Sequence, residues 1–265
     1  MSKINNLITE LERGNSKTLA RCITIVENEL KDYEKILTGI TPKNIPVVGI
    51  TGPPGAGKST LINAILRELT AQKKRVGIIA IDPTSPFNYG SLLGDRLRMG
   101  EHFVNENVFI RSLATRGSLG GLSAKTIEIT DVMRSSNFDI IFIETVGVGQ
   151  SEVEVVGLAD TTILVLVPES GDEVQTLKSG VMEIADIFVV NKSDRDGADI
   201  FIKNITAHRA ISINNKRTYL LTEKAYRLLQ NFRMKDIDKK TLEDQLKEAM
   251  GKKNFNLYAF VKKLT

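Results

Sequence analysis

The chain has 265 residues, of which 42 % are hydrophobic and 26 % are charged. This composition supports a full hydrophobic core and is ordinary for a soluble protein. No stretch approaches the roughly 20 apolar residues needed to cross a bilayer, and the first residues lack the apolar run of a signal peptide. The single cysteine, Cys22, excludes an intrachain disulfide and fits a reducing compartment. We therefore expect a cytoplasmic protein with no membrane partner, in which Cys22 is a buried core residue.

The formal net charge of +4 is unevenly distributed. Residues 203–265 carry 15 Lys/Arg and 6 Asp/Glu, which gives +9 and leaves −5 for the rest of the chain. A basic tail can contact acidic partners or nucleic acid, but a solvated helical surface is the commoner outcome. The tail also lacks the interleaved aromatics that stack on bases. Nucleic acid is therefore not the expected partner.

In chain order, residues 3–38 come first and predict two helices. Leu19, Ile23, Val26 and Leu30 have the spacing of one helical face. The sequence Thr-Pro-Lys-Asn at 41–44 then breaks the pattern and indicates a linker. We expect residues 1–44 to form an N-terminal helical arm.

From Ile45 onward, short continuous apolar runs rich in Ile and Val replace the helical pattern. Continuous rather than alternating hydrophobicity indicates strands buried on both faces, as in a parallel sheet covered by helices. We therefore predict an α/β fold, a P-loop NTPase domain at 45–200 with a mostly parallel sheet. The predicted strands are residues 46–51, 75–81, 108–111, 139–143, 162–167 and 187–190.

Beyond Asp199 we find no further strand run, and residues 201–265 predict a C-terminal helical arm. Two amphipathic helices are expected in this arm. They are marked by Leu221, Ala225, Leu228 and Phe232, and by Leu242, Leu246 and Met250.

Residues 52–59 read Gly-Pro-Pro-Gly-Ala-Gly-Lys-Ser and match the pattern GxxxxGK[ST] in full. The glycines allow backbone N–H groups to wrap around phosphate oxygens, and the helix predicted at 60–71 adds a partial positive charge. Lys58 would neutralise the β- and γ-phosphates, and Ser59 would offer its hydroxyl to Mg²⁺. The predicted phosphate-binding residues are Gly52, Pro54, Gly55, Ala56, Gly57, Lys58, Ser59 and Thr60.

Asn191-Lys192-Ser193-Asp194 closes the last apolar run. A carboxylate at Asp194 can accept hydrogen bonds from the N1–H and the 2-amino group of guanine, which adenine lacks. The position of this NKSD sequence, at a strand end downstream of a P-loop, favours GTP over ATP. We predict that Asn191, Lys192 and Asp194 bind the base.

Three acids are candidate metal ligands together with Ser59. Asp82 ends the second predicted strand, Glu144 ends the fourth, and Asp95 lies between them in Gly-Asp-Arg. The carboxyl ends of parallel strands face the ligand crevice, and carboxylates suit a hard cation such as Mg²⁺. Each acid alone could equally be a helix cap or a surface residue. The Gly-rich stretches at 117–121 and 147–150 look like phosphate-sensing loops that include Gly147, although glycine also marks ordinary turns.

Together these motifs resemble the MeaB/ArgK family of P-loop GTPases, which includes proteins described as LAO/AO transport ATPases. The resemblance runs from about Ala20 to Asp194, after which the C-terminal region is shorter than the family pattern. The family's further strand and its base-holding SA-type loop are not recognised there. The stretches that carry the resemblance are ARCITIVEN, GPPGAGKST, IDPTSPFNYGSLLGD, GSLGGLS, ETVGVGQSE, GDEVQTLKSGV and VVNKSD.

The resemblance implies a G-protein chaperone that gates cofactor loading or protection of an adenosylcobalamin-dependent acyl-CoA mutase similar to methylmalonyl-CoA mutase. It implies Mg²⁺-dependent GTP hydrolysis, slow without the partner, and a homodimer formed through the C-terminal arm. Lys58, Asp82 and Glu144 are then the catalytic residues, and Gln150, Gln175 and Lys178 lie in loops that respond to nucleotide or to the mutase. The alternatives are a transport-associated ATPase or kinase, and a nucleotide-dependent interaction module with little turnover.

Overall fold

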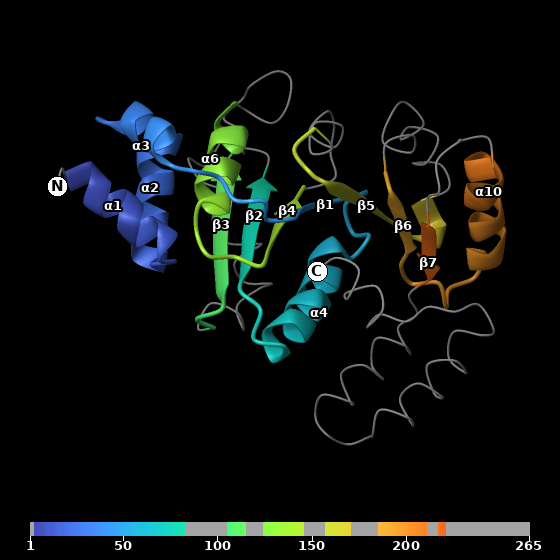
Figure 1. Ribbon diagram of the computed structural model, residues 1–265. Coiled ribbons are helices and arrows are strands. Elements are labelled where there is room, and N and C mark those ends of the chain that lie inside the picture. The colour runs from blue at the N-terminus through green and yellow to red at the C-terminus, as the bar shows by residue number, and fades with distance from the viewer. Residues whose placement is uncertain are drawn as a thin grey trace.

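The computed structural model describes residues 3–82, 105–114, 124–145, 157–170, 185–210 and 217–220. The chain begins with three short helices, where the sequence predicted two (Figure 1). Gly14, in a left-handed conformation with φ 83°, ends the first helix, and Asn15 caps the second by accepting a hydrogen bond from Thr18 N. These helices are α1 (Lys3–Glu12), α2 (Ser16–Glu27) and α3 (Tyr33–Gly39).

Three of the four residues predicted to share a helical face are buried, namely Leu19, Ile23 and Val26. The inclusion of Leu30 was wrong, because α2 ends at Glu27 and Leu30 lies in the following turn with 48 % of its surface exposed. The residues around it also leave the helical region, since Glu29 has φ 48°.

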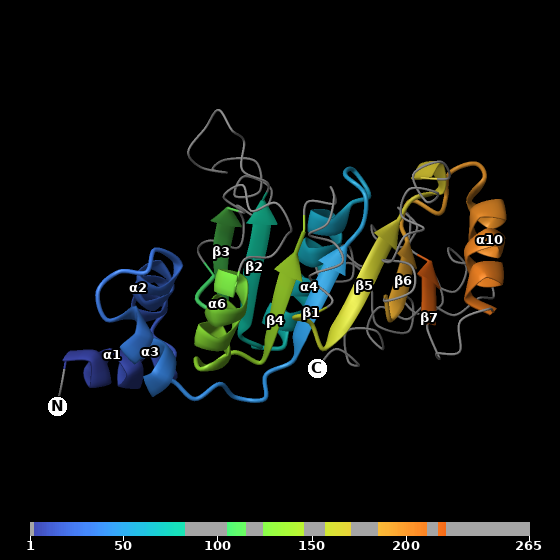
Figure 2. The ribbon, with the colours of Figure 1, turned by 90° about the horizontal axis from the view of Figure 1, so that it is seen from above.

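Seven strands form one sheet in the order β3-β2-β4-β1-β5-β6-β7, and all the strand pairings are parallel (Figure 2). The predicted parallel α/β fold is therefore confirmed, and each of the six expected strands is present. The strands are β1 (Val47–Thr51), β2 (Val76–Asp82), β3 (Val108–Ala114), β4 (Ile140–Glu144), β5 (Thr161–Leu166), β6 (Ile187–Val190) and β7 (Arg217–Leu220).

The expectation that strands stop after Asp199 was wrong. Helix α10 (Ala198–Ala210) follows β6, and β7 then pairs in parallel with β6, with Phe188 opposite Thr218. The sheet therefore extends beyond residue 200, where the sequence placed the end of the P-loop domain. Strand β7 has four residues at the edge of the sheet and a mixed polar sequence, Arg-Thr-Tyr-Leu, so it lacks the continuous apolar run of a doubly paired strand. The two predicted C-terminal helices lie outside the described residues.

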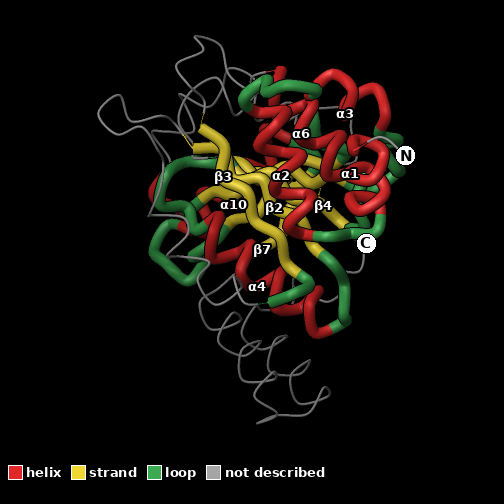
Figure 3. Tube along the Cα trace, turned by 90° about the vertical axis from the view of Figure 1, so that its left-hand side faces the viewer, coloured by secondary structure: helices red, strands yellow, loops and turns green. Residues whose placement is uncertain are grey.

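The two faces of the sheet are covered by different helices (Figure 3). Helix α4 (Lys58–Ala71) packs through Ile62, Ile65 and Leu66 on one face. Helices α1 to α3 and α6 (Ala124–Arg134) cover the other face, where Cys22 is fully buried. Burial raises the pKa of the Cys22 thiol to about 11, as expected for a core residue.

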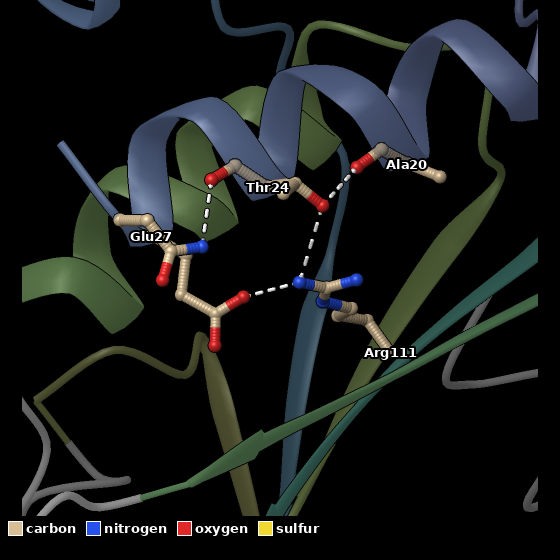
Figure 4. Close-up of polar contacts among 5 residues, drawn as sticks. Ala20, Thr24, Glu27 and Arg111 are labelled. Carbon is tan, nitrogen blue, oxygen red and sulfur yellow. Dashed lines mark hydrogen bonds and ion pairs between the residues drawn. The ribbon is translucent and has the colours of Figure 1, made fainter. Parts of the chain in front are cut away.

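The N-terminal helices are also held to the sheet by polar contacts. Arg111 of β3 forms an ion pair with Glu27 at the end of α2 and donates to Thr24 Oγ1 at 3.4 Å (Figure 4). Arg75, just before β2, donates to the carbonyl of Gly14 at 2.9 Å. Within the described part of the chain, no helix is long and apolar enough to cross a membrane.

Candidate nucleotide-binding site

The P-loop connects the end of β1 at Thr51 to the start of α4 at Lys58, as the sequence predicted. Gly52 has φ 139°, and a Cβ at that position would lie 2.0 Å from the carbonyl oxygen of Val165 on β5. Gly57 has φ 91°, and a Cβ there would lie 2.3 Å from Asn191 Nδ2. Both positions therefore require glycine, because any side chain would be strained and would overlap a neighbour.

Lys58 is only 6 % exposed, and its ammonium group lies against the loop that precedes it. The Nζ donates to the carbonyl oxygens of Gly52 at 2.7 Å and Pro53 at 3.0 Å. A buried ammonium held by main-chain carbonyls is oriented within the loop before a phosphate binds. Phosphate oxygens are strong acceptors for such a group. The other predicted loop residues differ in exposure: Pro54, Gly55 and Thr60 are exposed, Ser59 is partly buried, and Ala56 is buried.

Ser59 and Glu144 are in direct contact, although 85 positions separate them in the sequence. Ser59 Oγ donates to Glu144 Oε1 at 2.7 Å, and the Glu144 side chain is buried. Strand pairing brings them together, since Ile50 at the end of β1 lies opposite Glu144 at the end of β4. A hydroxyl beside a carboxylate is the oxygen donor set that suits Mg²⁺.

The two other acids predicted to bind metal are not placed at the site by the described residues. Asp82 ends β2 near the carboxyl end of the neighbouring strand β4, which Glu144 ends, but the Asp82 side chain is outside the described part of the structure. All of Asp95 is also outside it. No group of three or more His, Cys, Asp or Glu residues that could hold a metal occurs among the residues that are described. Gly147, Gln150, Gln175 and Lys178 also lie outside them.

The NKSD turn follows β6 and contacts the P-loop directly. Asn191 Nδ2 donates to the carbonyl of Ala56 at 2.8 Å, and Lys192 Nζ donates to that of Gly55 at 3.1 Å. The structure thus brings together two motifs that lie more than 130 residues apart in the sequence, and Asp194 is exposed at the end of this turn.

The sequence analysis missed two contacts near the carboxyl ends of the strands. Arg195 forms an ion pair with Glu169, which lies in the short helix η2 (Pro168–Ser170) after β5. The hydrogen bond from Arg195 lowers the pKa of Glu169 below its ordinary value. Thr145 Oγ1 and Thr51 Oγ1 form a buried hydrogen bond of 3.1 Å between the ends of β4 and β1. Thr51 ends β1 and Thr145 directly follows β4, and this position at the carboxyl ends of parallel strands, the rule that singled out Glu144, was the available signal.

A parallel sheet with a P-loop after β1 and an Asn-Lys-x-Asp turn after β6 defines a nucleotide-binding protein of the P-loop α/β class. Residues 19–245 match the family model described as methylmalonyl Co-A mutase-associated GTPase MeaB. The chain belongs to this family, so the resemblance based on sequence motifs is confirmed. The family match also extends well beyond Asp194, where the resemblance was thought to end.

Similar proteins agree with this assignment. A protein of Pyrococcus horikoshii, provisionally named as a GTPase, is 53 % identical over 208 residues, covering 78 % of this chain and 66 % of its own. The GTPase ArgK of Escherichia coli K12 is 38 % identical over 195 residues, covering 71 % and 59 %. The crystal structure of an LAO/AO transport system kinase matches with a TM-score of 0.68 and 26 % identity, covering 94 % of this chain and 81 % of that one. For the Pyrococcus and Escherichia coli proteins, the matched region thus spans less than two thirds of the relative's length.

Proposed function

We propose that this protein binds GTP with Mg²⁺ and hydrolyses it slowly, as a switch that acts on a cobalamin-dependent acyl-CoA mutase. The contact of Asn191 and Lys192 with the P-loop carbonyls is the observation that carries the proposal. This contact supports the proposal, because a turn with the Asn-Lys-x-Asp pattern expected to bind guanine lies against a loop with the pattern expected to bind phosphate. The family name supports both the nucleotide and the client, because it describes a methylmalonyl Co-A mutase-associated GTPase.

The phosphates would occupy the P-loop, where glycine backbone N–H groups and the start of α4 favour anions. Lys58 would exchange its carbonyl contacts with Gly52 and Pro53 for phosphate oxygens. Ser59 and Glu144 fit Mg²⁺ by their chemistry and would hold it, Ser59 directly and Glu144 directly or through water. When bound, the ion neutralises charge that develops on the phosphate oxygens.

The base would be read by Asp194, which is exposed and lies in the turn anchored by Asn191 and Lys192. Its carboxylate can accept from N1–H and from the 2-amino group of guanine. Adenine offers neither donor and would leave the carboxylate unpaired, which disfavours ATP.

Hydrolysis by the isolated chain is expected to be slow. In Ras-like GTPases a glutamine orients the attacking water, and here Gly147 is followed by Val148, whose side chain can neither donate nor accept. An arginine can stabilise the charge of the transition state, and Arg111 is one that the structure describes. It lies within β3 and pairs with Glu27, so it is not available for that role. A client that supplies or orders the missing groups would accelerate turnover.

The test compares nucleotides and then adds the client. Calorimetry with slowly hydrolysed analogues should show Mg²⁺-dependent binding of GTP and much weaker binding of ATP. Single-turnover hydrolysis should be slow alone and faster with a cobalamin-dependent mutase from the same organism. Equal binding of ATP and GTP would instead support an ATPase or a kinase, and the matched LAO/AO structure is described as a transport system kinase. Fast turnover that no mutase alters would contradict the switch.

A further inference from the structure

The turn that carries Asp194 is anchored on both sides. On its N-terminal side, Lys192 donates to the carbonyl of Gly55 in the P-loop. On its C-terminal side, Arg195 pairs with Glu169, and its backbone N–H donates to the carbonyl of Lys192 at 3.1 Å. Asp194 therefore lies in a closed turn whose two ends are attached to different parts of the sheet edge, the loop after β1 and the helix η2 after β5.

Glu169 is the acidic partner on one side of this turn. The hydrogen bond from Arg195 and the nearby positive charges of Arg195 and Lys192 hold the pKa of Glu169 below its ordinary value, so this carboxyl is ionised at neutral pH. The two side chains of the pair are each about half exposed. Such a pair contributes little to global stability, so its loss should change the turn locally without unfolding the protein.

We propose that Glu169 is a positioning residue for guanine recognition, acting through Arg195 to orient the turn that carries Asp194. The inference rests on the proposed GTP binding. Two hydrogen bonds to one carboxylate require both oxygens to lie near the plane of the base, because hydrogen bonds weaken steeply when misaligned. If the contact at Arg195 is lost, the turn can move relative to the base. Two simultaneous hydrogen bonds from the base to Asp194 would then be disturbed more than a single one.

The distinguishing probe is inosine triphosphate, whose base keeps N1–H but lacks the 2-amino group. With an oriented turn, the carboxylate makes two hydrogen bonds to GTP and one to inosine triphosphate. If Glu169 orients the turn, its loss should weaken GTP and leave inosine triphosphate nearly unchanged. A merely structural contact would weaken both nucleotides by the same factor.

The experiment measures the affinities of the whole chain for slowly hydrolysed analogues of both nucleotides by calorimetry with Mg²⁺. Glu169→Gln and Arg195→Gln should each lower the ratio of GTP to inosine triphosphate affinity about threefold, in line with an exposed charge pair. The double variant Glu169→Arg with Arg195→Glu should recover most of the ratio. High salt should lower the ratio in the unmodified protein and leave it unchanged in Glu169→Gln.

Glu10→Gln is a matched control, because it breaks the comparably exposed pair with Arg13 on α1, away from the P-loop. Its affinity ratio should equal that of the unmodified protein. An unchanged ratio in both Glu169→Gln and Arg195→Gln would overturn the proposal, and so would an equal loss of both nucleotides. Failure of the proposed function would look different, because the unmodified protein itself would then show no preference for GTP over ATP.

Discussion

Replacing Arg111 with alanine tests how firmly the N-terminal helices are attached to the nucleotide-binding sheet. The guanidinium of Arg111 pairs with Glu27 and donates to Thr24 Oγ1, which itself donates to the carbonyl of Ala20 (Figure 4). The side chains of Arg111 and Glu27 are 24 % and 16 % exposed. The substitution would therefore leave a mostly buried carboxylate without the cation that faces it.

The expected loss of folding free energy lies between the values typical of buried and of exposed ion pairs. Breaking a buried pair by removing one partner costs about 3–5 kcal/mol, whereas an exposed pair contributes about 0–1 kcal/mol. Since water still reaches part of both side chains, we expect Arg111→Ala to lower the free energy of unfolding by about 2–3 kcal/mol. For a chain of this size that corresponds to a fall in Tm of about 4–10 °C.

Urea unfolding followed by circular dichroism measures the change. The midpoint concentration should fall while the slope m stays constant, because the surface exposed on unfolding is nearly the same. The control is Arg13→Ala, which removes an exposed pair with Glu10 and should change the free energy by less than about 0.5 kcal/mol. The double variant Arg111→Met with Glu27→Leu should recover at least half of the loss, since no buried charge remains. If Arg111→Ala were no more destabilising than Arg13→Ala, the pair would not hold the arm.

The remaining predictions concern the nucleotide site and the core. Lys58→Ala should weaken binding of a slowly hydrolysed GTP analogue about ten- to a hundredfold in calorimetry while the domain stays folded, and unchanged affinity would remove its phosphate role. Asp194→Asn should weaken GTP and favour xanthosine triphosphate, because the new amide can donate to the 2-carbonyl; a variant that still prefers GTP would show that Asp194 does not read the base. Thr145→Val should lower the free energy of unfolding by about 1–3 kcal/mol, because it leaves the buried hydroxyl of Thr51 unpaired. Thr145→Ser keeps the hydroxyl and should restore the stability. Equal stability of the unmodified protein and both variants would contradict the hydrogen bond. Because burial raises the pKa of Cys22 to about 11, it stays a neutral thiol at pH 8, and a thiol reagent should modify it only after urea unfolding.

Most of the central sheet could be predicted because its inner strands are buried on both faces. Five of the expected runs form β1, β2, β4, β5 and β6, which each pair with a neighbour on both sides, and most of their apolar residues are buried. The sixth forms β3 at the edge of the sheet, where Leu113 is buried and the apolar start Val-Phe-Ile still marked the strand. The seventh strand could not be found this way, because Arg217–Leu220 has only four residues and begins with Arg-Thr, so it contains no such apolar run. The spacing of apolar residues in the N-terminal helices predicted which face is buried, but not which part of the protein this face packs against. The structure shows that Leu19 and Ile23 share a core with Ile79 and Ile141 of the sheet.

The site was predictable where a motif fixes the chemistry and unpredictable where two side chains meet through the fold. The spacing within residues 52–59 was enough to place a P-loop between a strand and a helix, although the helix begins at Lys58, two residues before the predicted start at 60. Nothing in the spacing between Glu169 and Arg195, 26 positions apart, indicates that they form a pair. That contact depends on η2 and the turn after β6 lying side by side at one edge of the sheet.

The contacts between the NKSD turn and the P-loop also determine which substitution can isolate base recognition. Asn191 donates to the carbonyl of Ala56 and lies where a side chain on Gly57 would be, so changing it would disturb the loop that holds the phosphates. Lys192 raises the same difficulty through its hydrogen bond to Gly55. A loss of GTP affinity in either variant could therefore arise from the phosphates, the base or both. Asp194 is exposed, and GTP and xanthosine triphosphate carry the same phosphates, so a change in preference between these two nucleotides on its substitution can be assigned to the base.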